Sequence, residues 1–193
     1  MPVKARALGK QRLAGALGES VRERLVRAML DNVLAALHAC GRIARVLVVS
    51  PEQGELPPGV RWVKDPGAGL NEALEAAAPL ALGSGATRLA VVFADLPLIG
   101  ASDLEALLAV SPSHLALAPD HTGTGTNALC VPASAQFRFK FGPGSCALHR
   151  AEAERLGLSV RLLRRPALAF DIDTPADVEH LKARGDPRYA FLG

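Results

Sequence analysis

The sequence has few aromatic residues, three cysteines and no long apolar run. Aromatic residues make up only 4% of the chain, which leaves few platforms for stacking bases, so we do not expect a nucleic-acid-binding protein. Cys40, Cys130 and Cys146 form no Cys-x-x-Cys pair, so the sequence predicts neither a disulfide framework nor a zinc site. Without about 18 consecutive apolar residues or the apolar core of a signal peptide, we expect a cytoplasmic protein with no membrane segment.

What is present indicates one compact domain. The chain has 193 residues, 49% of them hydrophobic, which is enough to bury a core. The formal net charge of +3 tolerates anionic ligands without indicating a basic binding surface. We expect a domain over residues 1–185 and a loosely attached C-terminal tail over 186–193.

Helical and strand patterns alternate along the chain. Val21, Leu25, Met29, Val33 and Leu37 follow the period of an amphipathic helix. It precedes "RVLVVS", a run typical of a strand buried on both faces. The same alternation then continues through "VRWV", "GLNEALEAAAPLAL", "RLAVVFA", "SDLEALLAV", "HLALAP", "NALCVP", "SCALHRAEAERLG", "SVRLLRRP", "LAF" and a last helix from Pro175. This order predicts an α/β fold.

Asp95 is the first candidate for chemistry. It follows the buried strand "RLAVVFA", and ligands of open α/β sheets collect beyond the carboxyl ends of the strands. The alternative is a turn or capping aspartate, but Ser102 with Glu105 already offers the next helix a capping box. We therefore interpret Asp95 as a functional residue.

The segment "AFDIDTPAD" places two more carboxylates near each other. Thr174, Pro175 and Asp177 have the types expected at the start of a helix, which leaves Asp171 and Asp173 unexplained. On an extended strand these two side chains point to the same face. Neighbouring carboxylates need a cation, and hard oxygen ligands suit Mg²⁺. A solvated acidic turn is the alternative.

Two glycine-rich segments suit anions. In "DHTGTGTNALCVP" the pattern Gly-x-Gly-x-x-Ala runs into a strand and not a helix, so it is not a dinucleotide fingerprint, but its N–H groups and the hydroxyl of Thr126 can cradle an anion. An ordinary hairpin turn is the alternative. In "FGPGSCALHR", Gly142 and Ser145 lie at a helix N-terminus, which attracts phosphate or carboxylate. We interpret His149, one turn later, as a surface histidine.

The N-terminal segment "PVKARALGKQRL" supplies basic residues on a loop. Basic residues on a loop are usually solvated, but beside a metal site Lys4, Lys10 and Arg12 can clamp a triphosphate. "KDPGAGLNEAL" adds glycines before a helix whose first turn holds Asn71, where backbone can approach a nucleotide.

In this order, "PVK", "DPGAGLNEAL", "ADLPL", "GTGTNAL", "FGPGS" and "DIDTP" resemble the guanylyltransferase family of coenzyme F420 biosynthesis. The resemblance runs from about residue 2 to about residue 180. It implies a single-domain, Rossmann-like (GT-A-like) nucleotidyltransferase with a mostly parallel mixed sheet between helices. It also implies transfer of GMP from GTP to 2-phospho-L-lactate, phosphoenolpyruvate or 3-phospho-D-glycerate. An apolar strand usually precedes "PVK" in this family, and here only Met1 does.

Residue by residue, the resemblance makes Asp95, Asp171 and Asp173 the ligands of Mg²⁺. It makes Thr126, Gly142 and Ser145 the contacts of the phosphorylated acid. Lys4, Lys10 and Arg12 would face the triphosphate, with Asn71 near the nucleoside.

The implied reaction needs no general base, because the attacking phosphate oxygen is already ionised. Positioning and charge stabilisation at the α-phosphate would then provide the catalysis. Two alternatives remain at this point: a related nucleotidyltransferase, such as a molybdenum-cofactor guanylyltransferase, and a noncatalytic nucleotide-binding module.

Overall fold

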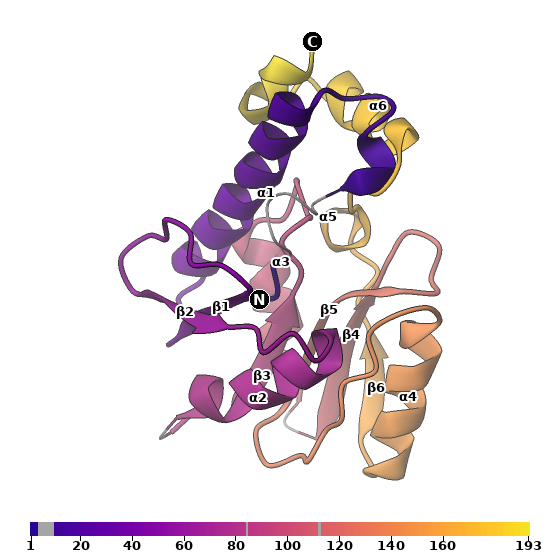
Figure 1. Cartoon of the computed structure of the whole chain (residues 1–193). Coiled ribbons are helices and arrows are strands. Elements are labelled where there is room, and N and C mark those ends of the chain that lie inside the picture. Colours follow the sequence, from indigo (N-terminus) through magenta and orange to yellow (C-terminus); the bar gives the residue numbers. More distant parts are fainter. Residues whose placement is uncertain (4–9, 84, 112) are drawn as a thin grey trace.

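The computed structural model describes residues 1–3, 10–83, 85–111 and 113–193, and it confirms the α/β fold class (Figure 1). In chain order the elements are η2 (Gln11–Leu13), α1 (Glu19–Ala39), β1 (Val46–Ser50), β2 (Val60–Lys64), α2 (Leu70–Leu82), β3 (Arg88–Val92), α3 (Ala101–Leu108), β4 (His114–Pro119), β5 (Thr126–Pro132), α4 (Ser145–Arg155), β6 (Ser159–Leu162), α5 (Pro166–Ala169), α6 (Pro175–Ala183) and η3 (Pro187–Leu192). None of the helices in these ranges is long and apolar enough to cross a membrane.

The larger sheet is mixed and has the strand order β3-β5-β4-β6. β4 and β6 are parallel, whereas β5 is antiparallel to both of its neighbours, β3 and β4. β3, β4 and β6 therefore run in one direction and β5 in the other. As a result, the start of β5 lies at the same edge of the sheet as the carboxyl ends of β3, β4 and β6.

The smaller sheet pairs β1 and β2 in parallel. Met1–Val3 lie beside β1, where Pro2 forms a parallel bridge with Val49 and the Val3 N–H donates to the Val49 carbonyl at 2.8 Å. The Met1 amine donates to the Leu47 carbonyl at 2.9 Å, and burial lowers the pKa of this amine to about 5.

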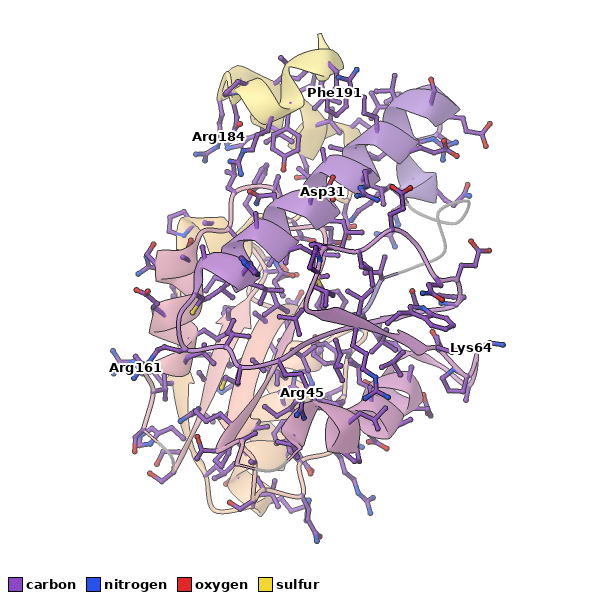
Figure 2. All side chains as sticks on the ribbon, turned by 90° about the vertical axis from the view of Figure 1, so that its left-hand side faces the viewer. Asp31, Arg45, Lys64, Arg161, Arg184 and Phe191 are labelled. Atoms are coloured by element: carbon purple, nitrogen blue, oxygen red, sulfur yellow. The ribbon has the colours of Figure 1, made fainter. Side chains whose placement is uncertain are left out.

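Helices cover both faces of the large sheet, as the apolar runs predicted. In β4, Leu115 and Leu117 pack in the cluster that includes α2 and α4, and Ala116 and Ala118 pack in the opposite cluster with α1 and α3. This alternation is the period of two expected of a strand that is buried on both sides. Charged side chains such as Asp31, Lys64 and Arg161 point outward (Figure 2).

A third apolar cluster joins the first half of α1 to the C-terminal elements. It buries Leu25 and Met29 of α1 against Leu181 of α6 and against Tyr189 and Leu192 of η3. Figure 1 shows η3 beside the N-terminal end of α1. The expectation of a loosely attached tail is therefore wrong, because the tail supplies two buried side chains to this cluster.

Local structure differs from the sequence-based expectation at two further places. Helix α3 is capped at Gly100, whose N–H donates to the Asp103 carboxylate at 3.0 Å, and not at Ser102. "LAF" is not extended throughout, because Leu168 and Ala169 belong to the short helix α5. Asp171 and Asp173 follow α5 in an irregular segment and not in a strand.

Candidate active site

Three carboxylates gather at the edge of the large sheet where β3, β4 and β6 end. One carboxylate oxygen from each of Asp95, Asp171 and Asp173 lies within 4.8 Å of the others. The Ile172 N–H donates to the Asp95 carbonyl at 3.3 Å and so joins the two segments that carry the carboxylates. Ile172 is fully buried, which leaves Asp171 and Asp173 directed toward Asp95. The predicted convergence is confirmed, although it does not require a strand.

Lys10 is the main counter-charge of this cluster. Its ammonium lies 2.6 Å from Asp95 Oδ2 and 2.8 Å from Asp173 Oδ1, with only 12% of the side chain exposed. Burial opposes the charge of Lys10, but the two carboxylates outweigh this effect and leave its pKa raised. Arg12 reaches Asp173 Oδ2 at 3.9 Å from an exposed position. Lys4 lies outside the described residues.

The electrostatics of the cluster suit a metal cation. Burial raises the pKa of the Asp171 carboxyl; a hydrogen bond from Asn127 works against this effect, and Asp95 and Asp173 add to it. Among the described residues, no hydrogen-bond donor reaches the buried Oδ1 of Asp95. Among the described residues, the three carboxylates have the Lys10 ammonium and the exposed Arg12 guanidinium beside them, and with the buried Oδ1 of Asp95 they form a donor set that fits a hard divalent ion.

Asn127 is a site residue that the sequence reasoning missed. Its amide nitrogen donates to Asp171 Oδ1 and to the Leu168 carbonyl, both at 3.1 Å. It therefore fixes the segment after α5 against the start of β5. Its place next to Thr126 in "GTGTNAL" was the available signal, but spacing alone does not show which way an amide points.

The loop that carries Asp95 is held from α1 and from the C-terminal segment. The amide nitrogen of Asn32 donates to the carbonyls of Leu96, Pro97 and Ile99 at 3.0–3.3 Å. The Tyr189 hydroxyl donates to the same Pro97 carbonyl at 3.0 Å. The buried tail thus positions the loop of a candidate metal ligand.

The two predicted anion-binding segments meet at the N-terminus of α4. The Cys146 N–H donates to the Thr124 carbonyl at 3.0 Å, and the Ser145 N–H to the Gly142 carbonyl at 3.1 Å. Thr126 and Ser145 are both buried. Gly142 has φ 132°, a conformation that favours glycine. Thr126, Gly142 and Ser145 thus belong to two loops that the structure joins, and their contact with a ligand stays a prediction.

Asp120 shapes the first of these loops. Its Oδ1 accepts hydrogen bonds from the Thr122 hydroxyl at 2.9 Å and from the Thr124 N–H at 3.0 Å. A Cβ on Gly125 would lie 2.6 Å from Asp120 Oδ2, so a larger residue there would displace the carboxylate that holds the loop. The glycines of this segment therefore serve the loop's shape.

Asn71 holds the second loop from α2. Its Oδ1 accepts from the Phe141 N–H at 2.8 Å, and its Nδ2 donates to the Phe141 carbonyl at 3.1 Å. Both ends of the amide are thus used to fix the loop before α4. The predicted contact of Asn71 with a nucleoside stays a prediction.

His149 corrects an interpretation made from the sequence. It is not a surface histidine, because its side chain is fully buried on α4. Its Nδ1 lies 3.0 Å from the Thr126 hydroxyl, and its Nε2 accepts from the Lys140 N–H at 3.0 Å. Burial lowers the pKa of His149 to about 4.

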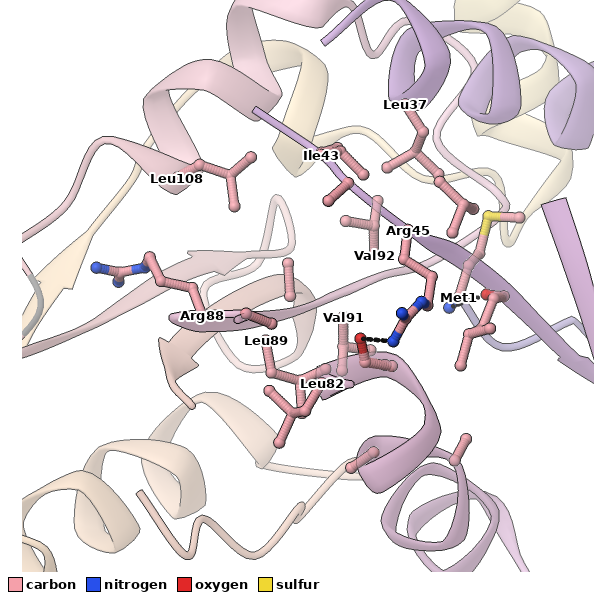
Figure 3. A pocket seen from close by; sticks show the side chains of 18 of the residues that line it. Met1, Leu37, Ile43, Arg45, Leu82, Arg88, Leu89, Val91, Val92 and Leu108 are labelled. Carbon is pink, nitrogen blue, oxygen red and sulfur yellow. Dashed lines mark hydrogen bonds between the residues drawn. The ribbon is translucent and has the colours of Figure 1, made fainter. Parts of the chain in front are cut away.

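A largely apolar cavity lies away from the carboxylates. It measures about 450 Å³ and lies between the two sheets, lined by residues of α1, β1, α2 and β3, with no residue of the carboxylate cluster (Figure 3). Arg45 closes one side by donating to the carbonyls of Leu80 and Ala81 at 3.1 and 3.3 Å. The charged chemistry is therefore separate from this cavity.

Comparison with known proteins identifies the family of the chain. The sequence model of the "Guanylyl transferase CofC like" family matches residues 1–191. A phosphoenolpyruvate guanylyltransferase of Sphaerobacter thermophilus is 43% identical, covering 94% of this chain and 90% of the relative. One of Rubrobacter xylanophilus is 40% identical, covering 98% and 95%. A 3-phospho-D-glycerate guanylyltransferase of Phenylobacterium zucineum is 37% identical, covering 91% and 84%.

Solved structures support the fold. A candidate nucleotide-diphospho-sugar transferase from Desulfovibrio desulfuricans G20 superimposes with a TM-score of 0.77 at 18% identity, covering 99% of this chain and 91% of the other. A nucleotidyl transferase from Methanothermobacter has a TM-score of 0.60 at 16% identity, covering 100% and 96%. At these identities the likeness concerns the arrangement of helices and strands.

Proposed function

The chain belongs to the CofC-like guanylyl transferase family and is a nucleotidyltransferase, and from this premise we propose that it transfers GMP from GTP to the phosphate of a small phosphorylated carboxylic acid, releasing diphosphate. The candidate acids are phosphoenolpyruvate, 3-phospho-D-glycerate and 2-phospho-L-lactate, and the names of the two relatives with 43% and 40% identity favour phosphoenolpyruvate. The product would serve coenzyme F420 biosynthesis. The observation that carries the proposal is the cluster of Asp95, Asp171 and Asp173 around Lys10 at one sheet edge.

The reaction is an in-line displacement at phosphorus. A phosphate oxygen of the acid forms a bond to the α-phosphorus of GTP, while the bond from that phosphorus to the bridging oxygen of the leaving diphosphate breaks. The attacking oxygen carries no proton at neutral pH, so no side chain has to remove one. Catalysis then depends on placing two anions together and stabilising the charge that develops.

The carboxylate cluster would hold Mg²⁺ through Asp95, Asp171 and Asp173. The bound ion would supply charge neutralisation at the α-phosphate and at the leaving diphosphate. The buried Oδ1 of Asp95, which no donor of the described ranges reaches, supports this assignment. Lys10 and Arg12 lie at the same cluster and would bring two cationic side chains to the phosphates of GTP.

The acid would bind between the start of β5 and the N-terminus of α4. Thr126, Gly142 and Ser145 lie there, and the dipole of a helix N-terminus favours a phosphate or carboxylate. Thr126 and Asn127 are consecutive, and Asn127 contacts Asp171. The proposed acid pocket and the carboxylates thus share one strand end, which would bring the attacking phosphate near the nucleotide's α-phosphate.

Diphosphate release tests the proposal. Purified protein is incubated with Mg²⁺, GTP and each of the three acids in turn, with glucose 1-phosphate and no acceptor as controls. We expect diphosphate only with GTP and one or more of the acids, and loss of turnover in Asp95→Asn. Equal release with the sugar phosphate would indicate a different acceptor class. No release with any acid would leave a nucleotide-binding module without this activity.

A further inference from the structure

His149 lies one helical turn after Ser145, and both of its ring nitrogens have a defined partner. Nε2 lies 3.0 Å from the backbone nitrogen of Lys140, and Nδ1 lies 3.0 Å from the hydroxyl oxygen of Thr126. The ring is fully buried. It also contacts Phe141 edge-on with a centroid distance of 4.6 Å, and Phe137 at 5.8 Å. The ring orientation is therefore fixed from three sides.

The partner of Nε2 determines where the ring carries its proton. A backbone N–H can only donate, so Nε2 must offer a lone pair, and the proton of the neutral ring must lie on Nδ1. A second proton on Nε2 would point at the Lys140 N–H. Burial keeps the ring neutral, with its pKa lowered to about 4. The Nδ1–H group therefore donates to the Thr126 oxygen.

The direction of this hydrogen bond determines where the Thr126 hydroxyl can point its own hydrogen. A hydroxyl that accepts the His149 hydrogen bond has its own hydrogen directed elsewhere. Thr126 begins β5, beside the N-terminus of α4, where we place the anionic acid. An anion offers only acceptor oxygens, so it is bound best when the hydroxyl presents its hydrogen.

We propose that His149 is a positioning residue that holds the Thr126 hydroxyl as a hydrogen-bond donor toward the phosphorylated acid. The inference rests on the proposed function and adds a residue to its acid pocket. In this proposal His149 acts on the acid only through Thr126. Its role is to fix the direction of one hydroxyl, and its hydrogen bond from Lys140 couples that direction to the loop before α4.

Two substitutions test the hydrogen bonds of the two ring nitrogens separately. In His149→Asn the amide nitrogen is bonded to Cγ, as Nδ1 is, so it can still donate to Thr126 while the contact to Lys140 is lost. In His149→Gln the amide lies one atom further out, as Nε2 does, so it can accept from Lys140 while the donation to Thr126 is lost. The two variants therefore separate the hydrogen bond that supports the Lys140 loop from the hydrogen bond that orients the Thr126 hydroxyl.

The readout is the KM of phosphoenolpyruvate, with the KM of GTP and the melting temperature as controls. We expect His149→Gln to raise the acid's KM about tenfold or more, in line with a lost hydrogen bond to a charged group, and to leave the GTP value near that of the wild type. His149→Asn should stay within about threefold of the wild type, because it keeps the donor. In a Thr126→Val background, His149→Gln should have no further effect on the acid's KM.

The outcomes separate this inference from the function it rests on. Wild-type protein that releases no diphosphate with any acid refutes the proposed function and the positioning role together. An active wild type in which His149→Asn and His149→Gln raise the acid's KM equally, or in which their effects add to that of Thr126→Val, refutes the positioning role alone. A GTP KM that rises in step with the acid's KM also refutes the positioning role alone.

Discussion

Replacing Asp171 by Asn should stabilise the metal-free protein and remove its response to Mg²⁺ with GTP. Asp171 has only 14% of its side chain exposed, and one of its oxygens lies within 4.8 Å of oxygens of Asp95 and Asp173. Its partner Asn127 donates to Oδ1 at 3.1 Å, and an amide oxygen at that position can still accept. The change therefore removes a charge but keeps the hydrogen bond.

The separation of the carboxylates sets the size of the expected stabilisation. Two unit charges 4.8 Å apart repel by about 0.9 kcal/mol at the dielectric constant of water and by about 3.5 kcal/mol at an effective value of about 20. Among the described residues, Asp171 faces two carboxylates, the Lys10 ammonium and, at 3.9 Å, the exposed His121 ring, so with a neutral ring about one such repulsion is left uncompensated. We expect the substitution to add about 1 kcal/mol to the free energy of unfolding, which raises the melting temperature by about 2–4 °C.

Thermal unfolding by circular dichroism in EDTA, in Mg²⁺ and in Mg²⁺ with GTP measures both effects. A ligand at about 100 times its Kd stabilises the wild type by about 2.7 kcal/mol, or about 5–11 °C. Asp171→Asn should show little of this gain. A matched control is Asp103→Asn, since Asp103 accepts from Arg165 Nε at 2.6 Å and from the Gly100 N–H at 3.0 Å.

The control should respond in the opposite way. Asp103→Asn weakens a cap and an ion pair, so it should lower the melting temperature while the response to Mg²⁺ with GTP is retained. The reasoning is refuted if Asp171→Asn lowers the metal-free melting temperature by many degrees, or if it keeps the full response to Mg²⁺ with GTP. Asp171 would then be a structural group.

Three further predictions concern other parts of the chain. Thr126→Ala and Ser145→Ala should each raise the acid's KM by about tenfold or more while calorimetric binding of GTP alone is unchanged; reduced GTP affinity would show that the acid is misplaced. Lys10→Met should lower the metal-free melting temperature but leave Mg²⁺ able to restore it, because the carboxylates lose their counter-charge; equal melting temperatures with and without Mg²⁺ would contradict this. Hydrogen bonds from Arg155 lower the pKa of Glu152 to about 2, below its unfolded value of 4.5, so the stability that Glu152 contributes is complete above pH 4.5 and is lost as the pH falls toward 2. Glu152→Gln should make the melting temperature depend less on pH in that window, and an unchanged pH profile would refute the ion pair's role.

Features written in short stretches of sequence were predicted well. The buried run "RLAVV" and the polar residue after it placed Asp95 at the end of β3. The Thr174, Pro175 and Asp177 pattern predicted the start of α6, where Asp177 N–H and side chain complete the capping box. Such signals depend on hydrogen bonds within a few residues, so one segment contains the whole cause.

Contacts between distant segments were not accessible in the same way. The Lys10 ammonium meets carboxylates 85 and 163 residues further along the chain. The basic loop suggested that Lys10 could clamp a triphosphate, and the resemblance agreed, but neither showed that it pairs with Asp95 and Asp173. The packed tail was also missed, although Asp186 as N-cap and Pro187 at the first position are recognisable signals of a helical turn. Six residues are too few to show which face is buried.

The direction of Thr126 shows most clearly why part of the site could not be predicted. By strict alternation Thr126 would share a face with Ala128, which packs in the cluster with α1, α3 and α5. Its hydroxyl instead contacts His149 of α4, on the opposite face. The pairing of β4 with β5 shifts between Ala118 and Pro119, so that Pro119 pairs with Thr126 and one residue of β5 is passed over. An irregularity of this kind re-aims a side chain. Here it turns Thr126 toward the proposed acid pocket while Asn127 reaches Asp171, so one shift in register joins the two halves of the site.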